Sequence, residues 1–314
     1  MKEWLRHLVR IFMPVYQFES DTMKILYAGY SPIKKSYYAR LLLNKDYHQT
    51  FLGIYWFSHI PKLIIRLNID MIVAEISRVT FNSFLECEGY ILPVWATMRI
   101  NINRPVCDIF NKSKTDFRDI IRRIRKYDLT YEISTDKKMF DFFNERFYLP
   151  YMKKRHGDEA FVEDLDSMWK SYAHPMTMVV KERGNIAGMT FLKVTDEILY
   201  LKRTGLIDGN EEYLSHGVIG AVYYFGIQEG LKMGCKYVDL GGSRPFLRDG
   251  LTRHKMGIGG EFELNLEPSK EYLWFGVNEK SLSAMEFLKQ NPFMHLGKDF
   301  RLVRYNYCEK VQNH

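Results

Sequence analysis

The sequence is poor in cysteine and lacks the spacings that metal and disulfide sites need. Its four cysteines, Cys87, Cys107, Cys235 and Cys308, lie far apart in a chain of 314 residues. They form no C-x-x-C pair and no cysteine–histidine cluster with the spacing of a zinc site, whereas disulfide-stapled domains are dense in cysteine. We therefore expect neither a metal site nor a disulfide framework, and a reducing, cytoplasmic location.

Long hydrophobic runs are also missing. The most apolar stretch, residues 51–67, is interrupted by polar and basic residues, and a membrane-spanning helix needs ~20 clean apolar residues. At the N-terminus, Lys2, Arg6 and Arg10 interrupt the apolar residues, so we expect mature sequence rather than a signal peptide. An N-terminal helix of this composition packs in a core or lies at a membrane interface, so peripheral membrane contact is a second possibility.

A nucleophile motif is missing as well. The sequence contains no G-x-S-x-G elbow, the turn that exposes a catalytic serine. Cys235 opens the apolar stretch CKYVDLGG, which predicts a buried strand. We therefore expect no covalent intermediate on a serine or cysteine side chain.

Positive charge is in excess and is concentrated in one segment. The chain has 45 Lys and Arg against 38 Asp and Glu, a net charge of +7. Residues 112–126 alone hold seven basic and two acidic residues, around the helical pattern TDFRDIIRRIRKY. A solvated helix face is the plain interpretation, and the alternative is binding of tRNA, a sugar-nucleotide diphosphate or a lipid head group.

The order of predicted elements indicates an α+β protein with two domains. Three runs rich in β-branched and aromatic residues predict strands in the first hundred residues: 24–30, 70–77 and 90–102. Proline, asparagine and serine residues then interrupt the pattern over 103–114. We place the boundary there, between an N-terminal α/β domain of residues 1–110 and a second domain of residues 111–314.

The second domain is predicted to mix helices with an antiparallel meander. Its predicted helices lie at 115–127, 140–156 with a kink at Pro150, 161–173, from Ser215 to Met233, and 281–290. Its predicted strands lie at 129–134, 176–182, 185–195, 197–206, 235–242, 261–266, 272–277 and 299–307, with a glycine- and arginine-rich loop over 241–260. The sheet therefore changes from antiparallel to parallel around the Ser215 helix, where we expect a crevice.

The start of that helix is suited to hold an anion. Ser215 is a typical N-cap residue, and Ser215-His216-Gly217-Val218 would present unpaired N–H groups at the positive end of the helix dipole. The small Gly217 permits close approach of a phosphate. These four residues are our candidates for cofactor binding.

Over residues 112–265 the sequence resembles the FemAB-like branch of the GNAT-fold acyltransferases, which includes aminoacyl-tRNA-dependent peptidoglycan transferases. The segments that carry the resemblance are SKTDFRDIIRRIRKYDLTYEIS, FYLPYMKKRHG, MTMVVKERGNIAGMTFLKVTDEILYLKRTG and KMGCKYVDLGGSRPFLRDGLTRHKMGIGGEF. The resemblance implies a GNAT-like mixed antiparallel/parallel sheet flanked by helices. It also implies an acyl donor, either acyl-CoA or aminoacyl-tRNA, at the Ser215 helix and an amine or hydroxyl acceptor opposite. The stretch LSHGVI departs from the family's CoA loop, Gln/Arg-x-x-Gly-x-Gly/Ala.

The resemblance implies that Lys255 is the cation near the reacting end of the donor. Acyl transfer passes through a tetrahedral oxyanion, which a nearby cation stabilises. Arg244 and Arg253 are candidates for binding the donor. The alternative is that these cations lie on a solvated face or form structural ion pairs.

A base for the attacking amine has three candidates: Asp239, Asp249 and His216. A buried aspartate after a strand more often holds the next loop through backbone N–H groups, and a lone histidine more often packs or caps.

The sequence thus predicts an acyltransferase that moves an acyl group from acyl-CoA to an amine by direct attack, without a metal. The acceptor is a small-molecule, lipid-linked or sugar-linked amine. Two alternatives stay open: a Fem-type transferase that uses aminoacyl-tRNA, and a non-catalytic GNAT scaffold that binds an anion.

Overall fold

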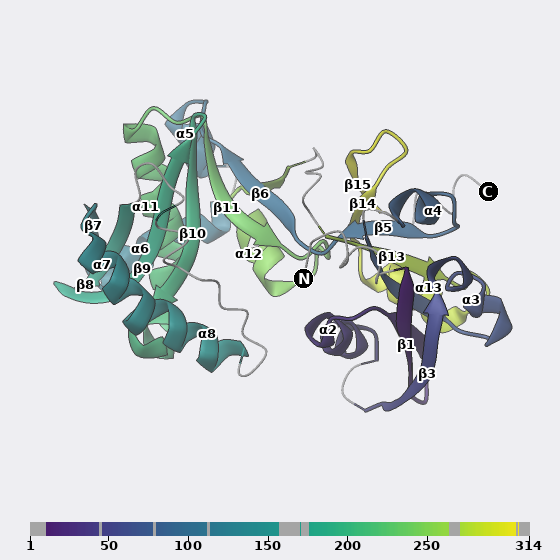
Figure 1. Ribbon diagram of the computed structural model, residues 1–314. Helices are drawn as coiled ribbons and strands as arrows, with labels where there is room; N and C mark the ends of the chain where they lie inside the picture. The colour runs from purple at the N-terminus through teal and green to yellow at the C-terminus, as the bar shows by residue number, and fades with distance from the viewer. Residues whose placement is uncertain are drawn as a thin grey trace. The chain divides into compact units, whose positions relative to one another are not determined.

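The computed structural model describes residues 11–43, 46–77, 80–111, 114–156, 170, 176–263, 271–305 and 307. The chain forms two compact units, each assembled from segments that are far apart in sequence (Figure 1). Unit 1 comprises Met1–Ala96, Ser243–Thr252 and Glu263–His314, and unit 2 comprises Thr97–Gly242 and Arg253–Phe262. This division differs from the single boundary expected between residues 110 and 111, because a C-terminal strand joins the sheet of the N-terminal segment.

Unit 1 contains a six-stranded sheet in the order β3-β1-β2-β4-β13-β5. The strands are β1 (Phe12–Glu19), β2 (Lys24–Ala28), β3 (His48–Trp56), β4 (Met71–Ile76), β5 (Tyr90–Pro93) and β13 (Tyr272–Val277). β2 and β4 are parallel, and β13 pairs antiparallel with both β4 and β5. β13 thus places the C-terminal part of the chain in the middle of this sheet.

Helices cover the sheet of unit 1 on both faces. They are α2 (Pro32–Leu43), η1 (Phe57–His59), α3 (Leu63–Arg66), α4 (Phe81–Leu85) and α13 (Leu282–Gln290), with a hairpin of β14 (Met294–Leu296) and β15 (Leu302–Arg304). All six residues of β4 are buried, and alternate residues enter different cores. Val73 packs with Tyr38 of α2, whereas Ile72 packs with Leu63 of α3. A strand covered on both faces is expected to be a continuous apolar run, as DMIVAEIS is.

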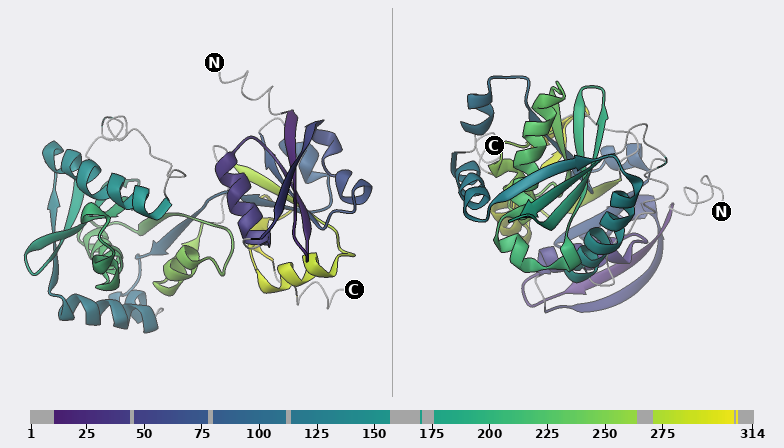
Figure 2. Two further views of the ribbon diagram at one scale, coloured as in Figure 1. Left: turned by 90° about the horizontal axis from the view of Figure 1, so that it is seen from below. Right: turned by 90° about the vertical axis from the view of Figure 1, so that its left-hand side faces the viewer.

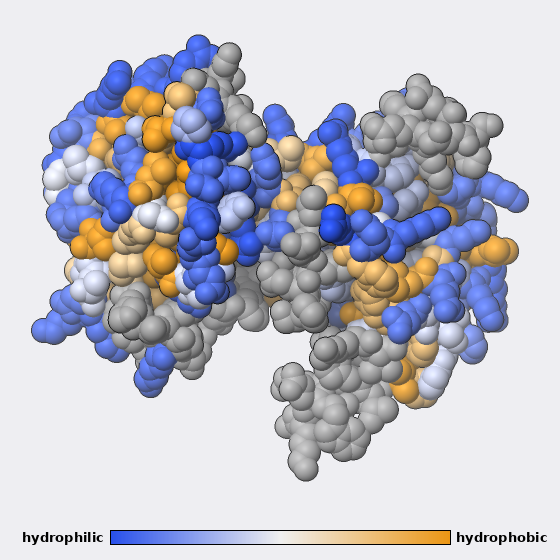
Figure 3. Space-filling view, turned by 90° about the horizontal axis from the view of Figure 1, so that it is seen from above, coloured by the Kyte–Doolittle hydropathy of each residue, from blue (hydrophilic) through white to orange (hydrophobic). Residues whose placement is uncertain are grey.

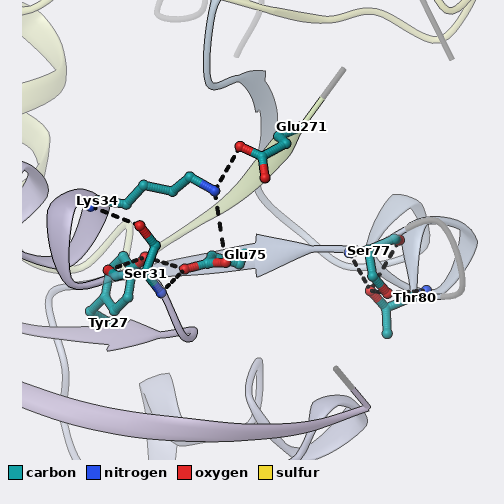
Figure 4. A network of polar contacts seen from close by, with 7 residues as sticks. All are labelled: Tyr27, Ser31, Lys34, Glu75, Ser77, Thr80 and Glu271. Atoms are coloured by element: carbon teal, nitrogen blue, oxygen red, sulfur yellow. Dashed lines mark hydrogen bonds and ion pairs between the residues drawn. The ribbon is translucent and has the colours of Figure 1, made fainter. Parts of the chain in front are cut away.

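A buried carboxylate fixes the start of α2 (Figure 4). Glu75, near the end of β4, accepts hydrogen bonds from the Tyr27 hydroxyl at 2.5 Å and from the Ser31 N–H at 2.7 Å. Lys34 Nζ lies 3.8 Å from Glu75 Oε2 and 2.9 Å from Glu271 Oε2. Burial, with the Glu75 charge beside it, raises the pKa of Tyr27, so this hydroxyl remains a donor. The network ties α2 to the parallel pair β2 and β4.

The strands predicted at 24–30, 70–77 and 272–277 are confirmed, but other N-terminal predictions were wrong in part. The run 90–102 divides into β5 and β6 (Ala96–Asn101), which belong to different sheets. Phe12 begins a strand rather than continuing an N-terminal helix, and residues 1–10 lie outside the described residues. β1 and β3 were not predicted, because their mixed polar and aromatic residues lack a clean alternation.

Unit 2 contains a seven-stranded sheet in the order β12-β6-β11-β10-β9-β8-β7. Its other strands are β7 (Leu129–Ser134), β8 (Met176–Glu182), β9 (Asn185–Thr195), β10 (Ile198–Leu206), β11 (Tyr237–Ser243) and β12 (Glu261–Phe262). The predicted antiparallel meander is confirmed as β8, β9 and β10, and β11 then pairs parallel with β10. The mixed sheet expected from the sequence is therefore confirmed.

Helices flank this sheet on both faces (Figure 2). They are α5 (Val106–Asn111), α6 (Lys114–Lys126), α7 (Lys137–Phe143), the π-helix η2 (Asn144–Tyr148), α8 (Leu149–His156), η4 (Ile207–Gly209), α10 (Glu211–Ser215), α11 (Val218–Lys232) and α12 (Gly250–Gly257). Phe117 of α6 and Val222 of α11 belong to one hydrophobic core. Phe140 of α7 and Phe147 of η2 belong to another, together with Phe191 of β9. The α+β class is thereby confirmed. The helix predicted at 161–173 lies outside the described residues, apart from Lys170.

One turn before Pro150, where the sequence predicts a kink, the π-helix η2 lies between α7 and α8. Proline has no N–H to bond the carbonyl of residue 146, and its ring clashes with that carbonyl in a regular helix. A wider turn relieves this clash. The main chain of η2 also lies against Gly205 of β10, where a Cβ atom would come within 2.4 Å of the Phe147 carbonyl oxygen.

The surface carries apolar side chains beside polar ones, as Figure 3 shows for one face of the molecule. In unit 1 the exposed large hydrophobic side chains include Phe12 of β1 and Phe51, Ile54 and Trp56 of the edge strand β3. Phe12 and Trp56 contact each other edge to face, with ring centroids 5.0 Å apart. Within the described residues, no helix combines the length and the apolar composition needed to cross a membrane.

Candidate functional site

β10 and β11 pair over a short length and then part. Their parallel register runs from Ile198 opposite Tyr237 to Tyr200 opposite Asp239. Beyond Tyr200, β10 pairs only with β9, as far as Leu206. We call this point, after Tyr200 and Asp239, the β10–β11 divergence. It is the antiparallel-to-parallel junction that the sequence predicts.

A β-bulge lies in β10 directly after the divergence. The register with β9 shifts between Lys202 and Thr204, and Arg203 has a φ of 55°. The Thr204 hydroxyl donates to Thr190 Oγ1 at 2.9 Å, and the Thr190 hydroxyl donates to the Arg203 carbonyl at 3.2 Å. Thr190 is fully buried, so these bonds hold the bulge from within the sheet. A bulge bends its strand and increases the local twist, which separates β10 from β11.

Asp239 holds the turn at the end of β11. Its carboxylate is buried, accepts the Gly241 N–H at 2.8 Å and accepts a hydrogen bond from Arg99 Nε at 3.2 Å. Lys202 Nζ of β10 lies 4.0 Å from the same carboxylate. Gly241 has a φ of +76°, which glycine adopts without strain. Asp239 therefore anchors the Gly241 turn, and its role as a base stays a prediction.

Lys255 reaches the same turn from α12. Its side chain is 3% exposed, and Nζ donates to the carbonyl oxygens of Gly242 at 2.8 Å and Gly241 at 3.3 Å. A buried ammonium group needs such partners, because burial without them is costly. The structure thus brings two predicted residues, Lys255 and Asp239, to one turn at the β10–β11 divergence. A fixed cation in a buried position is able to stabilise a developing oxyanion.

The glycine- and arginine-rich stretch 241–260 is not all loop, as the sequence suggested, because it contains α12. Asp249 caps this helix, since its Oδ1 accepts the N–H groups of Leu251 at 3.0 Å and Thr252 at 3.1 Å. Asp249 therefore has a capping role. Arg253 is exposed on α12 in unit 2, whereas Arg244 belongs to unit 1.

Ser215 does not cap the long helix, so that prediction was wrong. Asn210 caps the short helix α10 by accepting the Glu212 N–H at 3.0 Å, and Ser215 is the last residue of α10. The Ser215 hydroxyl donates to the Glu212 carbonyl at 2.7 Å. Gly217, with a φ of 88°, stands at the N-cap of α11 instead. A left-handed residue was needed there to turn the chain from α10 into α11.

The N-terminus of α11 is packed against α6. A Cβ on Gly217 would lie 2.7 Å from Cδ of Arg123, and Val218 is fully buried. The Arg123 guanidinium donates to the Ser215 carbonyl and, through Nε, to Asp119 at 2.7 Å. An arginine side chain therefore occupies the approach to Gly217 that the sequence analysis assigned to a phosphate.

His216 lies in a separate cluster. Its ring stacks on Tyr127 with centroids 3.9 Å apart, and Nδ1 lies 2.9 Å from Glu182 Oε2. Nε2 lies 3.8 Å from Glu212. These contacts join α10 to the end of α6 and to β8, whereas Lys255 contacts the end of β11. The structure therefore supports a packing role for His216 more directly than a catalytic one.

The basic helix predicted at 115–127 is confirmed as α6. Phe117 and Ile120 are buried on its inner face. The outer face presents exposed basic side chains beside Ile121: Arg118, Arg122, Arg125 and Lys126. Arg122 pairs with Asp119 on the same helix, and its hydrogen bond holds the pKa of that carboxyl below its usual range. The outer face of α6 is thus a basic surface.

Sequence reasoning missed the partners of the turn, Arg99 and Lys202, and the bracing pair Thr190 and Thr204. One signal for the bulge was present, since Lys202 and Arg203 are two consecutive charged residues in an alternating strand. Arg99 carried no local signal. In the described part of the chain, no group of three or more His, Cys, Asp or Glu side chains is placed to hold a metal ion.

The sequence matches no family model and no curated protein. Among solved structures, FemX is 11% identical with a TM-score of 0.44, covering 88% of this chain and 90% of FemX. L-PGS from Bacillus licheniformis is 11% identical with a TM-score of 0.42, covering 88% and 84%. A GCN5-related N-acetyltransferase from Sphaerobacter thermophilus is 13% identical with a TM-score of 0.32, covering 83% and 75%.

Proposed function

We propose that unit 2 is an acyltransferase in which an amine attacks the acyl carbonyl of a donor at the β10–β11 divergence. The observation that carries this proposal is Lys255, a buried cation held by two main-chain carbonyls where the strands part. The acceptor is a small-molecule, lipid-linked or sugar-linked amine. Attack is direct, with no acyl group on a side chain: the amine nitrogen bonds to the acyl carbon. The bond from that carbon to the sulfur of CoA, or to the ribose oxygen of tRNA, then breaks, and the leaving group takes up the proton that the amine loses.

Lys255 stabilises the oxyanion that forms when the amine adds to the carbonyl. Because its ammonium group is already fixed by Gly241 and Gly242, little reorganisation accompanies the development of charge. Asp239 lies in the same turn and is our candidate for the proton acceptor, directly or through water. Its bonds to Arg99 and the Gly241 N–H also give it a positioning role. We propose no step through His216, because its contacts lie elsewhere.

Acyl-CoA is the first donor to test. Its phosphates would lie toward the N-terminus of α11, where Gly217 is the N-cap and Val218 the first residue, with His216 just before it and Arg253 on α12 as a further cation. Arg123 lies at Gly217, so a bound phosphate would contact this guanidinium or displace it. Arginine forms bidentate bonds with phosphate, which makes contact the favoured outcome.

Aminoacyl-tRNA is the second candidate, favoured by the basic outer face of α6. This face presents Arg118, Arg122, Arg125 and Lys126 to solvent. Phosphodiester backbones bind such surfaces with strong salt dependence. The departure of the stretch LSHGVI from the family's CoA loop also favours this donor.

A thermal-shift comparison separates the donors. CoA, acetyl-CoA and a long-chain acyl-CoA are each added at a saturating concentration, with bulk aminoacyl-tRNA in parallel. A ligand at ~100 times its dissociation constant adds about 2.7 kcal/mol to stability, which corresponds to several degrees. A shift with CoA compounds alone supports the first donor, and a shift with tRNA alone supports the second. A shift with neither contradicts both.

Lys255→Met separates catalysis from binding alone. Methionine keeps much of the side-chain volume and removes the charge, and Lys236→Met is the matched control because Lys236 is a half-exposed surface lysine in the same unit. We expect Lys255→Met to lose transfer activity by about 100-fold or more, with donor binding retained. Equal transfer activity of the two variants would remove Lys255 from the mechanism. Donor binding without any transfer by the original protein would instead favour a non-catalytic scaffold.

A further inference from the structure

The guanidinium group of Arg244 lies between two aromatic rings within unit 1. Its Cζ is 3.8 Å from the ring centroid of Tyr37 and 4.2 Å from that of Trp95. Tyr37 belongs to α2, Trp95 lies between β5 and β6, and Arg244 directly follows β11. Three separate segments therefore converge on one cation.

The backbone of Arg244 is fixed as well as its side chain. The buried Thr252 hydroxyl donates to the Arg244 carbonyl at 2.8 Å. Two residues later, Phe246 is buried and contacts the rings of Tyr38 and Phe275. Arginine loses considerable rotamer freedom when it is held in one position, and here the fold has already imposed that loss.

The contacts with the two rings leave the edge of the guanidinium group for hydrogen bonding, because its donors all lie in the plane of the group. Part of this edge faces the buried Tyr38: burial raises the pKa of the Tyr38 hydroxyl, and the charge and hydrogen bond of Arg244 lower it. Among the described residues, no carboxylate forms an ion pair with Arg244. Burial raises the pKa of Tyr37, the Arg244 charge opposes this rise, and the Asp249 carboxylate adds to it. Oδ1 of Asp249 accepts the N–H groups of Leu251 and Thr252.

A guanidinium edge held in this way matches the geometry of a phosphate or carboxylate, which accepts two parallel N–H bonds. Trp95 is 46% exposed, so one wall of the stack faces solvent. We propose that Tyr37, Arg244 and Trp95 form a receptor for an oxyanion, the phosphate or carboxylate group of a ligand bound by unit 1. This role for Arg244 replaces the donor-binding role expected from the sequence, and it is separate from the Lys255 chemistry in unit 2 because its test measures binding alone.

The indole N–H signals of the full-length protein in a ¹H–¹⁵N NMR spectrum provide the readout. Trp95→Phe identifies the Trp95 signal by its loss. Inorganic phosphate, pyrophosphate and acetate are then titrated separately at constant ionic strength. We expect a saturable shift of the Trp95 signal with at least one of the three. The preferred anion distinguishes a phosphate ligand from a carboxylate ligand.

Three variants test the role of the stacked guanidinium. Arg244→Gln removes the charge and is expected to weaken binding by about tenfold or more. Arg248→Gln removes an exposed arginine from the same loop and is expected to leave affinity within about twofold. Arg244→Lys keeps the charge without the planar fork, so we expect a loss of several-fold.

Several results would overturn the proposal. One is the absence of a saturable Trp95 shift with any of the three anions. Another is an equal loss of affinity in Arg244→Gln and Arg248→Gln, which would indicate diffuse charge. Should Arg244→Gln fail to fold by circular dichroism, Arg244→Lys decides: undiminished affinity in that variant would refute recognition by a stacked guanidinium, and a several-fold loss would support it.

Discussion

Gly205 of β10 is the position at which a single methyl group should disturb unit 2 most directly. In Gly205→Ala the new Cβ would lie 2.4 Å from the Phe147 carbonyl oxygen, 2.5 Å from its carbonyl carbon and 2.9 Å from the Tyr148 nitrogen. All three are main-chain atoms of η2, so no side-chain rotation relieves the contact. Either η2 or β10 has to move.

The expected cost follows from the rigidity of both partners. β10 is paired with β9 as far as Leu206, and η2 carries Phe147 into a core that includes Phe191. Adding a methyl group to a well-packed interior typically costs about 1–3 kcal/mol. In a domain of roughly 150–250 residues, each kcal/mol lowers Tm by about 2–4 °C, so we expect a loss of roughly 2–12 °C.

Differential scanning calorimetry of the purified variants measures this loss. Gly250→Ala is the matched control, because a Cβ on Gly250 meets nothing within 4 Å. It also stands at the first position of α12, where alanine is a better helix former. We expect the control to unfold within about 1 °C of the original protein or slightly above it. Equal Tm values for the two variants would refute the close approach of β10 and η2.

Three further predictions concern stability and pH. Gly217→Ala places a side chain at a φ of 88° and against Arg123, so we expect a loss of about 1–2 kcal/mol in urea unfolding; an unchanged midpoint would contradict the packing of α6 on α11. Asp239→Asn weakens the bond to Arg99, and we expect a loss of about 1–3 kcal/mol by the same measurement; transfer activity that stays intact in the folded variant would exclude Asp239 as the base. Burial lowers the pKa of His295 from 6.5, so the unfolded chain takes up the proton first as the pH falls, and stability decreases below about pH 6.5. We expect the Tm of His295→Gln to depend less on pH than that of the original protein. Parallel curves of Tm against pH for the two proteins would contradict this prediction.

The elements that the sequence predicted well are those with local signals. β8 and β9 are apolar runs whose central residues are buried, and they are joined at Arg183 and Gly184, whose φ values of 49° and 82° suit a tight hairpin turn. α13 begins at the cap residue Ser281, whose side chain accepts the Ala284 N–H. Each of these features is decided within a few residues, so a single sequence reveals it.

The features that the sequence could not reveal depend on distant partners. Arg99 and Asp239 are 140 residues apart, and no local pattern relates them. β13 looks like any buried strand, yet it pairs with β4 and β5 and so moves the C-terminal segment into unit 1. The burial of Lys255 and its contacts with Gly241 and Gly242 follow from tertiary structure, so no local pattern reveals them. Only the family resemblance singled out this lysine.

The error at Ser215 shows how two local signals compete. Both Asn210 and Ser215 are good N-cap residues. The apolar pattern of the long helix, taken alone, favoured Ser215 as its N-cap. The chain instead used Asn210 for α10 and then needed a left-handed residue, Gly217, to begin α11. Glycine is the residue that adopts this conformation freely, so Gly217 was the better signal for the helix start.

The irregular features of β10 support the placement of the reaction at the divergence. Within three residues this strand has a bulge at Arg203, with a φ of 55°, and a glycine in contact with the main chain of a π-helix. Strained backbone persists where the surrounding structure enforces it, and it is found preferentially at functional sites. Here the fully buried Thr190 holds the conformation of Arg203 through its hydrogen bond to the Arg203 carbonyl. This bulge lies at the β10–β11 divergence, where Nζ of Lys255 contacts the end of β11. If the bulge served packing alone, replacing Thr190 by valine would lower stability without altering a Lys255-dependent activity. If the bulge positions the reacting groups, that activity should fall in the folded variant as well.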